Sequence, residues 1–378
     1  MSAAVDASEI RDLLAQLVAI ESVNPTLVAG GAGEAELARF VAEWFERRRV
    51  PVEYHDLGGS RANVVARVSG HGSGRSLLLN GHLDTVGTGG DDAGLSPRVD
   101  GNRLYGRGAY DMKGSVAAVM LVAATVAEHP LAGDLIVTAV ADEEAYSIGS
   151  EAIAATVMAD AAIVAEPTEM RVAVAHKGFV WLEVATDGVA AHGSRYDLGV
   201  DAIARMGSTL VGLAELDERL RRDREPHPLL GGASLHASLI EGGQELSTYP
   251  DRCLLKVERR TLPGESAADV EQQLVAIAGE HAKVQTLFVR HPLETAGDEL
   301  IVETLIEQAS AVLGRPPDVV GAPFWTDAAL LSAAGVPSVV FGPRGAGAHA
   351  DEEWVDLDDL VKLAEILLAT AKAFSDYR

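Results

Sequence analysis

Cysteine is almost absent from this chain, which has one, Cys253, among 378 residues. A single thiol excludes an intramolecular disulfide framework and any zinc site built from several thiolates. Cys253 begins the alternating run 253–257. This position favours packing within a strand over the function of a nucleophile.

Positive charge is also scarce, since 31 Lys and Arg stand against 56 Asp and Glu, for a formal net charge of −25. Such an excess repels nucleic acid and anionic membranes. The N-terminus lacks the basic segment of a signal peptide, and the longest apolar run, 114–127, is shorter than the roughly 20 residues that span a bilayer. We therefore expect a soluble, cytoplasmic protein with no nucleic acid or membrane as partner.

Apolar periodicity in the first part of the chain indicates alternating helices and strands. Short apolar runs at 77–79, 135–140 and 163–165 predict buried strands, and 114–127 is apolar on all sides, as in a buried helix. Similar patterning resumes with a helix at 300–313, a strand at 338–341 and a closing helix at 357–374. These segments predict an α/β fold with a central mixed sheet flanked by helices.

The middle of the chain has a different order of elements. Strands are expected at 179–186, 234–240, 252–259 and 284–289, and helices at 200–220 and 267–278. Their order, β-α-β-β-α-β, is that of a ferredoxin-like module. The sequence thus predicts a catalytic domain in two parts, 1–175 and 290–378, with a smaller α+β domain of dimerisation or lid type inserted at 176–289.

Histidines and carboxylates follow the ends of four expected strands. His82 and Asp84 follow the first, the acidic run 142–144 follows the second, Glu166 follows the third, and His349 lies in a glycine-rich loop after the fourth. Ligands bind at the carboxyl ends of strands in open α/β sheets. Asp111, after a Gly-Arg-Gly turn, adds a further carboxylate.

This mixture of side chains suits zinc, which accepts imidazole nitrogen and carboxylate oxygen, and a carboxylate-rich set suits two metals. Taken alone, Asp111 is more readily explained as a turn or cap residue and a lone histidine as a structural one. Several such residues at strand ends reverse that balance. The His-x-Asp spacing of His82 and Asp84 also fits a carboxylate that orients a ligating imidazole.

Five blocks of sequence together resemble the signature of a metallohydrolase family that includes acetylornithine deacetylase, succinyl-diaminopimelate desuccinylase and glutamate carboxypeptidase. The blocks, in family order, are His-Leu-Asp-Thr-Val at 82–86, Gly-Arg-Gly-Ala-Tyr-Asp-Met-Lys-Gly at 106–114, Asp-Glu-Glu at 142–144, Glu-Pro-Thr at 166–168 and Ala-His at 348–349. Single blocks are weakly specific, but the long block and the ordered set are highly specific.

The resemblance implies a site for two Zn²⁺ ions per chain, in which Co²⁺ or Mn²⁺ can substitute. It implies that His82 and Glu166 bind one ion, that Glu144 and His349 bind the other, and that Asp111 bridges both. Glu143 matches the general base of the family, and Asp84 the carboxylate behind His82. The peptide bond after the bridging aspartate is expected to be cis.

The resemblance also assigns residues outside the metal cluster. His192 matches a histidine that reaches into the active site of the partner in a homodimer, and Arg260 matches an arginine that binds a substrate carboxylate. Thr326 matches a loop near the substrate. From the sequence alone, His192 is equally well a turn residue, and Arg260 a surface charge at a strand end.

The function expected from this resemblance is hydrolysis of the amide bond of a small N-acyl amino acid with a free carboxylate, by acetylornithine deacetylase or succinyl-diaminopimelate desuccinylase chemistry. A metallo-carboxypeptidase or dipeptidase is the alternative, and a non-catalytic binding relative is disfavoured because Glu143 and the ligands are present. A nucleotide-binding dehydrogenase is disfavoured because the glycine cluster at 30–33 follows an expected helix. No Gly-x-Ser-x-Gly motif supports a serine hydrolase.

Overall fold

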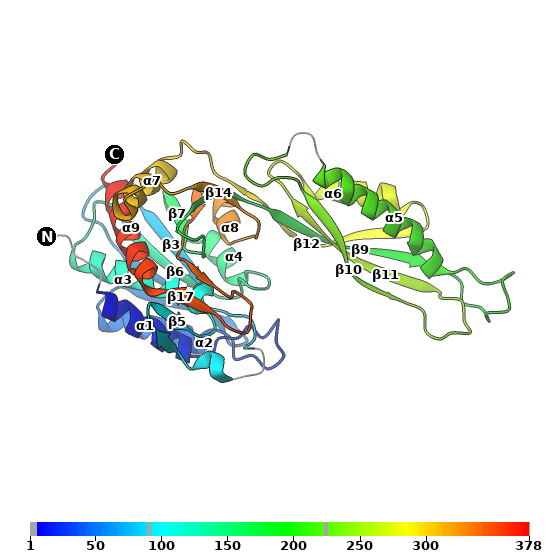
Figure 1. The fold of residues 1–378 in the computed structure, drawn as a ribbon, viewed down its shortest axis with the longest axis horizontal. Helices are drawn as coiled ribbons and strands as arrows, with labels where there is room; N and C mark the ends of the chain where they lie inside the picture. The colour runs from blue at the N-terminus through cyan, green and yellow to red at the C-terminus, as the bar shows by residue number, and fades with distance from the viewer. Residues whose placement is uncertain (1–5, 89–91, 223–225, 378) are drawn as a thin grey trace. The chain divides into compact units, whose positions relative to one another are not determined.

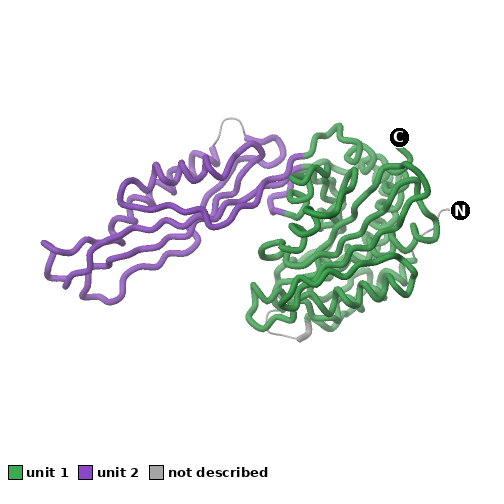
Figure 2. The backbone as a smooth tube through the Cα atoms, turned by 180° about the vertical axis from the view of Figure 1, so that it is seen from behind, with its two compact units in different colours: residues 1–174, 295–320, 326–378 green, residues 175–294, 321–325 purple. Residues whose placement is uncertain are grey.

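The computed structural model describes residues 6–88, 92–222 and 226–377, which form two compact units. Unit 1 comprises residues 1–174, 295–320 and 326–378, and unit 2 comprises 175–294 and 321–325 (Figure 2). The insertion expected at 176–289 thus begins at 175, and the chain returns to unit 1 at 295 rather than 290. Leu293 and Glu294 form a short strand that pairs with His176 and Ala175, so the two ends of the insertion lie side by side in unit 2.

Unit 1 is built on a mixed sheet, which confirms the predicted fold class (Figure 1). Its strands run in the order β1 (Val52–Gly58), β2 (Arg61–Val68), β6 (Leu135–Val140), β3 (Leu77–His82), β7 (Ala161–Val164), β15 (Ser338–Val340) and β8 (Val172–His176). Strands β6, β3, β7 and β15 pair in parallel, whereas β1 with β2, β2 with β6 and β15 with β8 pair antiparallel. The short strands β13 (Leu293–Glu294) and β14 (Val319–Ala322) also pair with β8.

The central strands of this sheet are buried at every position, because helices cover both faces of the sheet. The helices of unit 1 are α1 (Ala7–Ala19), α2 (Ala35–Arg47), α3 (Gly114–Glu128), α4 (Ile148–Ala154), α7 (Leu300–Leu313), α8 (Ala328–Ala333) and α9 (Leu357–Asp376). Short helical turns also occur at Asp92–Leu95 and Ala109–Lys113. A small second sheet has the order β16 (Gly345–Ala346), β17 (Trp354–Asp356), β5 (Arg103–Tyr105) and β4 (Arg98–Asp100).

The strongly apolar helix α3 lies in the core of unit 1. With the preceding turn it spans Ala109–Glu128, which is long and apolar enough to cross a membrane by length and composition alone. However, 83% of its most apolar window is buried inside the protein. Helix α3 is therefore apolar on all sides because core residues surround it, as the sequence predicts for 114–127.

Unit 2 contains β9 (Gly178–Asp187), α5 (Ala202–Arg221), β10 (Ser234–Gly242), β11 (Arg252–Thr261), α6 (Ala267–Ala278) and β12 (Ala282–Arg290). Its antiparallel sheet has the order β10-β11-β9-β12, as expected for a ferredoxin-like module. Cys253 is 1% exposed and belongs to the apolar core beneath α5 and α6. This burial agrees with a packing role.

Candidate metal centre

The carboxyl ends of the parallel strands in unit 1 carry the side chains of the site. Strand β3 ends at His82, and the turn 142–144 begins two residues after the end of β6 at Val140. Glu166 follows β7, and the loop after β15 leads to His349. Because these four strands are parallel neighbours, their ends share one edge of the sheet.

Asp111 lies between two imidazole rings. Its Oδ1 is 3.1 Å from Nε2 of His82, and its Oδ2 is 3.5 Å from Nε2 of His349. Glu166 Oε1 is 3.5 Å from His82 Nε2, and Glu144 Oε2 is 3.0 Å from His349 Nε2. One oxygen of Asp111 therefore faces His82, which also lies near Glu166. The other oxygen faces His349, which also lies near Glu144. This is the geometry of a bridging group. The peptide bond from Asp111 to Met112 is cis, as expected from the resemblance.

Two overlapping groups of side chains meet the spacing of a metal site. Ligand atoms of His82, Glu143 and Glu166 lie within 4.8 Å of one another, and so do those of His82, Asp111 and Glu144. Imidazole and carboxylate are the donors that zinc and other borderline divalent cations accept. The donor set therefore fits a pair of metal ions.

Electrostatics support the same conclusion. Burial, followed by repulsion from neighbouring carboxylates, raises the pKa of Glu143 and of Glu166 well above the usual value. Burial alone would lower the pKa of His82, but Glu166 and Asp111 raise it well above the usual value. Hydrogen bonds to Asp111 and Glu144 raise the pKa of His349 to about 10. Without a cation, the cluster must hold protons to offset its negative charge, so it is suited to bind positive ions.

Asp84 contacts His82 through both its backbone carbonyl and its carboxylate, at the His-x-Asp spacing noted in the sequence. Nδ1 of His82 is 2.9 Å from the backbone carbonyl of Asp84 and 3.5 Å from its carboxylate. The Asp84 carboxylate also accepts the backbone N–H groups of Glu143 and Glu144, both at 3.1 Å. Its side chain thus fixes the turn that carries the predicted base and one ligand, and its backbone orients the histidine.

A buried polar network behind this turn was not found from the sequence. Asn24 Nδ2 donates to Asp84 at 2.8 Å and to Asp142 at 2.9 Å. Arg61 forms ion pairs with Glu34 at 2.9 Å and Asp142 at 2.8 Å, and it donates to Asn24 at 2.7 Å. Asp142 has a φ of +70°, a conformation that a non-glycine residue adopts only when its surroundings hold it.

No local pattern marks these network residues. Asn24 precedes a proline and Arg61 begins β2, positions that ordinarily indicate a turn and a strand end. Their contacts join segments that are 60 and 118 positions apart in the chain. The folded structure identifies these residues as part of the site, because it shows that Arg61 and the carboxylates it contacts are buried together.

The three remaining predicted residues lie outside this cluster of contacts. His192 is an exposed loop residue of unit 2 whose Nδ1 lies 2.8 Å from Ser194 Oγ. Arg260, on β11 of the same unit, donates from Nε to Glu258 at 2.6 Å. Thr326, in unit 1, is fully buried, and its hydroxyl accepts the Ala328 N–H at the start of α8. The catalytic and substrate-binding roles of all three stay predictions.

Known proteins share both the sequence and the fold of this chain. A model of peptidase family M20/M25/M40 matches residues 78–373. Acetylornithine deacetylase from Myxococcus xanthus is 33% identical over 383 residues, covering 96% of this chain and 97% of that protein.

Two solved structures show the same fold. An M20 metallo-carboxypeptidase from Sulfolobus solfataricus has a TM-score of 0.79 at 20% identity and covers 98% of this chain and 100% of its own. A dinuclear metal-binding M20 peptidase from Bacillus subtilis has a TM-score of 0.74 at 16% identity, with 98% of both chains covered. The family model matches most of this chain, and imidazole and carboxylate groups that can bind metal lie close together in it. The chain therefore belongs to peptidase family M20/M25/M40 and is a metal-dependent hydrolase.

Proposed function

We propose that this protein is a di-zinc amidohydrolase that removes the acyl group from a small N-acyl amino acid, in the manner of acetylornithine deacetylase or succinyl-diaminopimelate desuccinylase. The observation that carries the proposal is the position of Asp111 between His82 and His349, with Glu143 beside the cluster. The acetylornithine deacetylase from Myxococcus xanthus, similar over nearly the whole chain, supports a deacylase over a peptidase.

The proposed site assigns one ion to His82, Asp111 and Glu166 and the other to Asp111, Glu144 and His349. When bound, the two ions supply Lewis acidity that polarises the scissile carbonyl and acidifies water. Asp111 would hold both ions, because one of its oxygens lies near His82 and the other near His349. Zinc is the preferred ion for such mixed imidazole and carboxylate donors, and Co²⁺ and Mn²⁺ are alternatives.

Glu143 is the proposed general base. Its carboxylate takes a proton from the water that attacks the amide carbon, and it returns that proton to the nitrogen of the leaving amine. Its backbone N–H is held by Asp84, so the side chain starts from a fixed turn. Burial, and then the Glu166 carboxylate, raises the pKa of Glu143 while no metal ion is bound.

Two residues of unit 2 complete the proposal. Arg260 has the planar guanidinium that suits bidentate binding of the substrate carboxylate. His192 is proposed to donate a hydrogen bond to the developing oxyanion in the site of a second subunit. Its exposure on a loop supports this role, since a buried side chain cannot reach another chain.

The proposed subunit partner is a second copy of the chain, bound along the outer strand of unit 2. Leu239 and Ile240 on β10 are 64% and 55% exposed, and β10 is the end strand of its sheet. An edge strand with exposed apolar side chains can pair with the same strand of another chain. Leu239→Glu should convert dimers to monomers in analytical ultracentrifugation, whereas Val275→Glu, at a half-exposed position on α6, should not. Equal effects of both variants would reject this surface.

The activity is tested by a hydrolysis screen over N-acetyl-ornithine, N-succinyl-diaminopimelate and simple dipeptides, with zinc content measured on the same protein. We expect up to two zinc ions per chain and turnover of an N-acyl amino acid. Glu143→Gln should lower turnover about 10²- to 10⁴-fold while the metal content stays unchanged. Turnover within a few fold of the wild type would reject Glu143 as the base, and cleavage of dipeptides alone would favour the peptidase.

A further inference from the structure

Glu353 lies beside the metal centre without contacting its ligand atoms directly, and it is 3% exposed. Its Oε1 accepts the backbone N–H groups of Tyr110 at 2.8 Å and Asp111 at 2.9 Å. Its Oε2 accepts the backbone N–H of Gly108 at 2.9 Å and Nη1 of Arg107 at 2.8 Å. A buried carboxylate thus receives four hydrogen bonds from one turn, the turn that carries Asp111.

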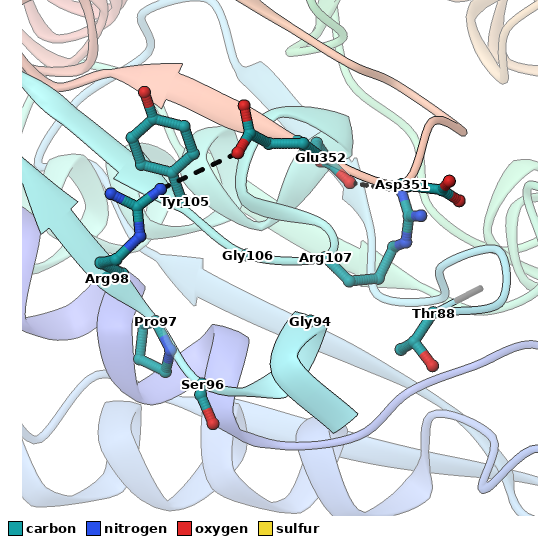
Figure 3. Close-up of a pocket in the computed structure, with 11 residues that line it drawn as sticks. Thr88, Gly94, Ser96, Pro97, Arg98, Tyr105, Gly106, Arg107, Asp351 and Glu352 are labelled. Carbon is teal, nitrogen blue, oxygen red and sulfur yellow. Dashed lines mark hydrogen bonds and ion pairs between the residues drawn. The ribbon is translucent and has the colours of Figure 1, made fainter. Parts of the chain in front are cut away.

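Arg107 connects this turn to the loop of the second histidine. Its guanidinium is buried, pairs with Glu353 through Nη1 and donates through Nη2 to the carbonyl of Ala350 at 2.5 Å. Ala350 directly follows His349. Figure 3 shows Arg107 extending along the wall of a pocket toward Asp351, with Gly106 before it in the same turn.

We propose that Glu353 and Arg107 are positioning residues that set the Asp111 carboxylate between the two imidazoles and hold the His349 loop against it. The inference rests on the proposed metal-dependent function. Glu353 acts on the backbone of Asp111, and Arg107 acts on the backbone next to His349. Two ligands from distant parts of the chain are therefore held by one buried ion pair, so metal binding does not have to organise both loops.

The energetic argument concerns unmatched donors. Charged hydrogen bonds of this kind are strong, and a buried N–H left without an acceptor costs about 1–3 kcal/mol. Glu353 satisfies three backbone donors that lie in a turn and have no helical partner. If the carboxylate is altered, the turn must move to recover acceptors, and Asp111 moves with it.

Glu353→Gln is the sharpest test because glutamine keeps the shape of the side chain. Whichever way the amide lies, its NH₂ group faces two donors, so two hydrogen bonds are lost. We expect the dissociation constant for zinc, measured by chelator competition, to rise about tenfold to hundredfold, as for other groups that support metal ligands. The visible spectrum of the Co²⁺-loaded variant should differ from that of the wild type, a signature that loss of general stability does not produce.

Glu352→Gln is the matched control. Glu352 is the preceding residue, its side chain is 75% exposed, and its contact with Arg98 is 3.9 Å long (Figure 3). This variant should bind Zn²⁺ and Co²⁺ like the wild type. Arg107→Met removes both the ion pair with Glu353 and the link to Ala350 but keeps the three backbone bonds to Glu353. A smaller loss of zinc affinity than in Glu353→Gln is therefore expected.

The outcomes separate the inference from the proposed function. A wild-type protein that binds no stoichiometric metal would reject the function and the inference together. A wild type that binds metal, with Glu353→Gln equal to it in affinity and cobalt spectrum, would reject the inference alone. If Glu353→Gln does not fold, Arg107→Met decides: wild-type affinity and spectrum there would also overturn the proposed positioning role.

Discussion

Replacing Arg61 with methionine should test the buried network that supports the metal site. Arg61 is 7% exposed and forms ion pairs with Glu34 and Asp142, whose side chains are 0% and 2% exposed. Methionine keeps much of the side-chain volume but leaves both carboxylates without their cation. Breaking buried pairs in this way costs about 3–5 kcal/mol of unfolding free energy. Turnover should also fall, because Asp142 begins the turn that carries Glu143.

The cost of Arg61→Met should grow with pH. Burial, and then the Asp84 carboxylate, raises the pKa of Glu34 to about 7, whereas Arg61 opposes that rise. Without Arg61 the folded variant holds a proton on Glu34 to higher pH than the wild type does. A raised carboxyl pKa contributes stability that is present below the unfolded value of 4.5 and is lost as pH rises through the folded value. The variant should therefore lose more stability at about pH 8 than at about pH 6.

The assay is urea unfolding of the metal-free protein at both pH values, with Arg67→Met as the control. Arg67 lies on the same strand and pairs with Asp134 at 3.1 Å, but both side chains are more than a third exposed. Its loss should cost about 0–1 kcal/mol. Adding Glu34→Gln to Arg61→Met should restore part of the loss, because it removes one unpaired charge. A cost for Arg61→Met no larger than that for Arg67→Met at both pH values would refute the reasoning.

Further predictions concern the metal and the loop of His349. Because the pKa of His349 is about 10 without metal, binding must displace protons, so zinc affinity should rise with pH, and calorimetry in buffers of different ionisation enthalpy should detect their release. Chelated protein should melt at a lower temperature as pH rises above neutrality, since the stability due to the raised pKa of His349, about 10, is lost in that direction. Zinc should reverse the loss in scanning calorimetry. Gly347→Ala should weaken zinc binding, because Gly347 has a φ of +86° and a Cβ there would lie 1.9 Å from the Glu352 carbonyl oxygen. Gly314→Ala, with a φ of +70° but open space around it, is the control and should leave zinc affinity unchanged.

Much of the fold follows from local patterns in the sequence. The run at 135–140 forms β6 with the expected bounds, and the expected helix at 267–278 is α6. Apolar periodicity works here because burial of one face or of a whole segment is a property of consecutive residues. The same periodicity does not show the short strand of Leu293 and Glu294, which pairs with Ala175 and His176, more than a hundred positions earlier in the chain. Such a pairing has no local signal.

For the site, the residue types and their order along the chain were enough to predict the cluster of His82, Asp111 and Glu166. Strand ends in a parallel sheet meet at one edge, so a histidine or carboxylate after each strand already implies proximity. The folded chain alone shows that each oxygen of Asp111 faces a different imidazole and that the Asp84 carboxylate holds the turn of Glu143 as well as lying beside His82.

The supporting residues belong entirely to the tertiary structure. Asn24 reaches Asp142 across 118 positions, and Glu353 reaches Asp111 across 242. Such contacts form because a buried charge must find partners wherever the packed chain brings them, and those partners are not specified by neighbours in sequence. Local patterns therefore predict which atoms can bind metal, whereas burial and long-range hydrogen bonds determine how firmly those atoms are held.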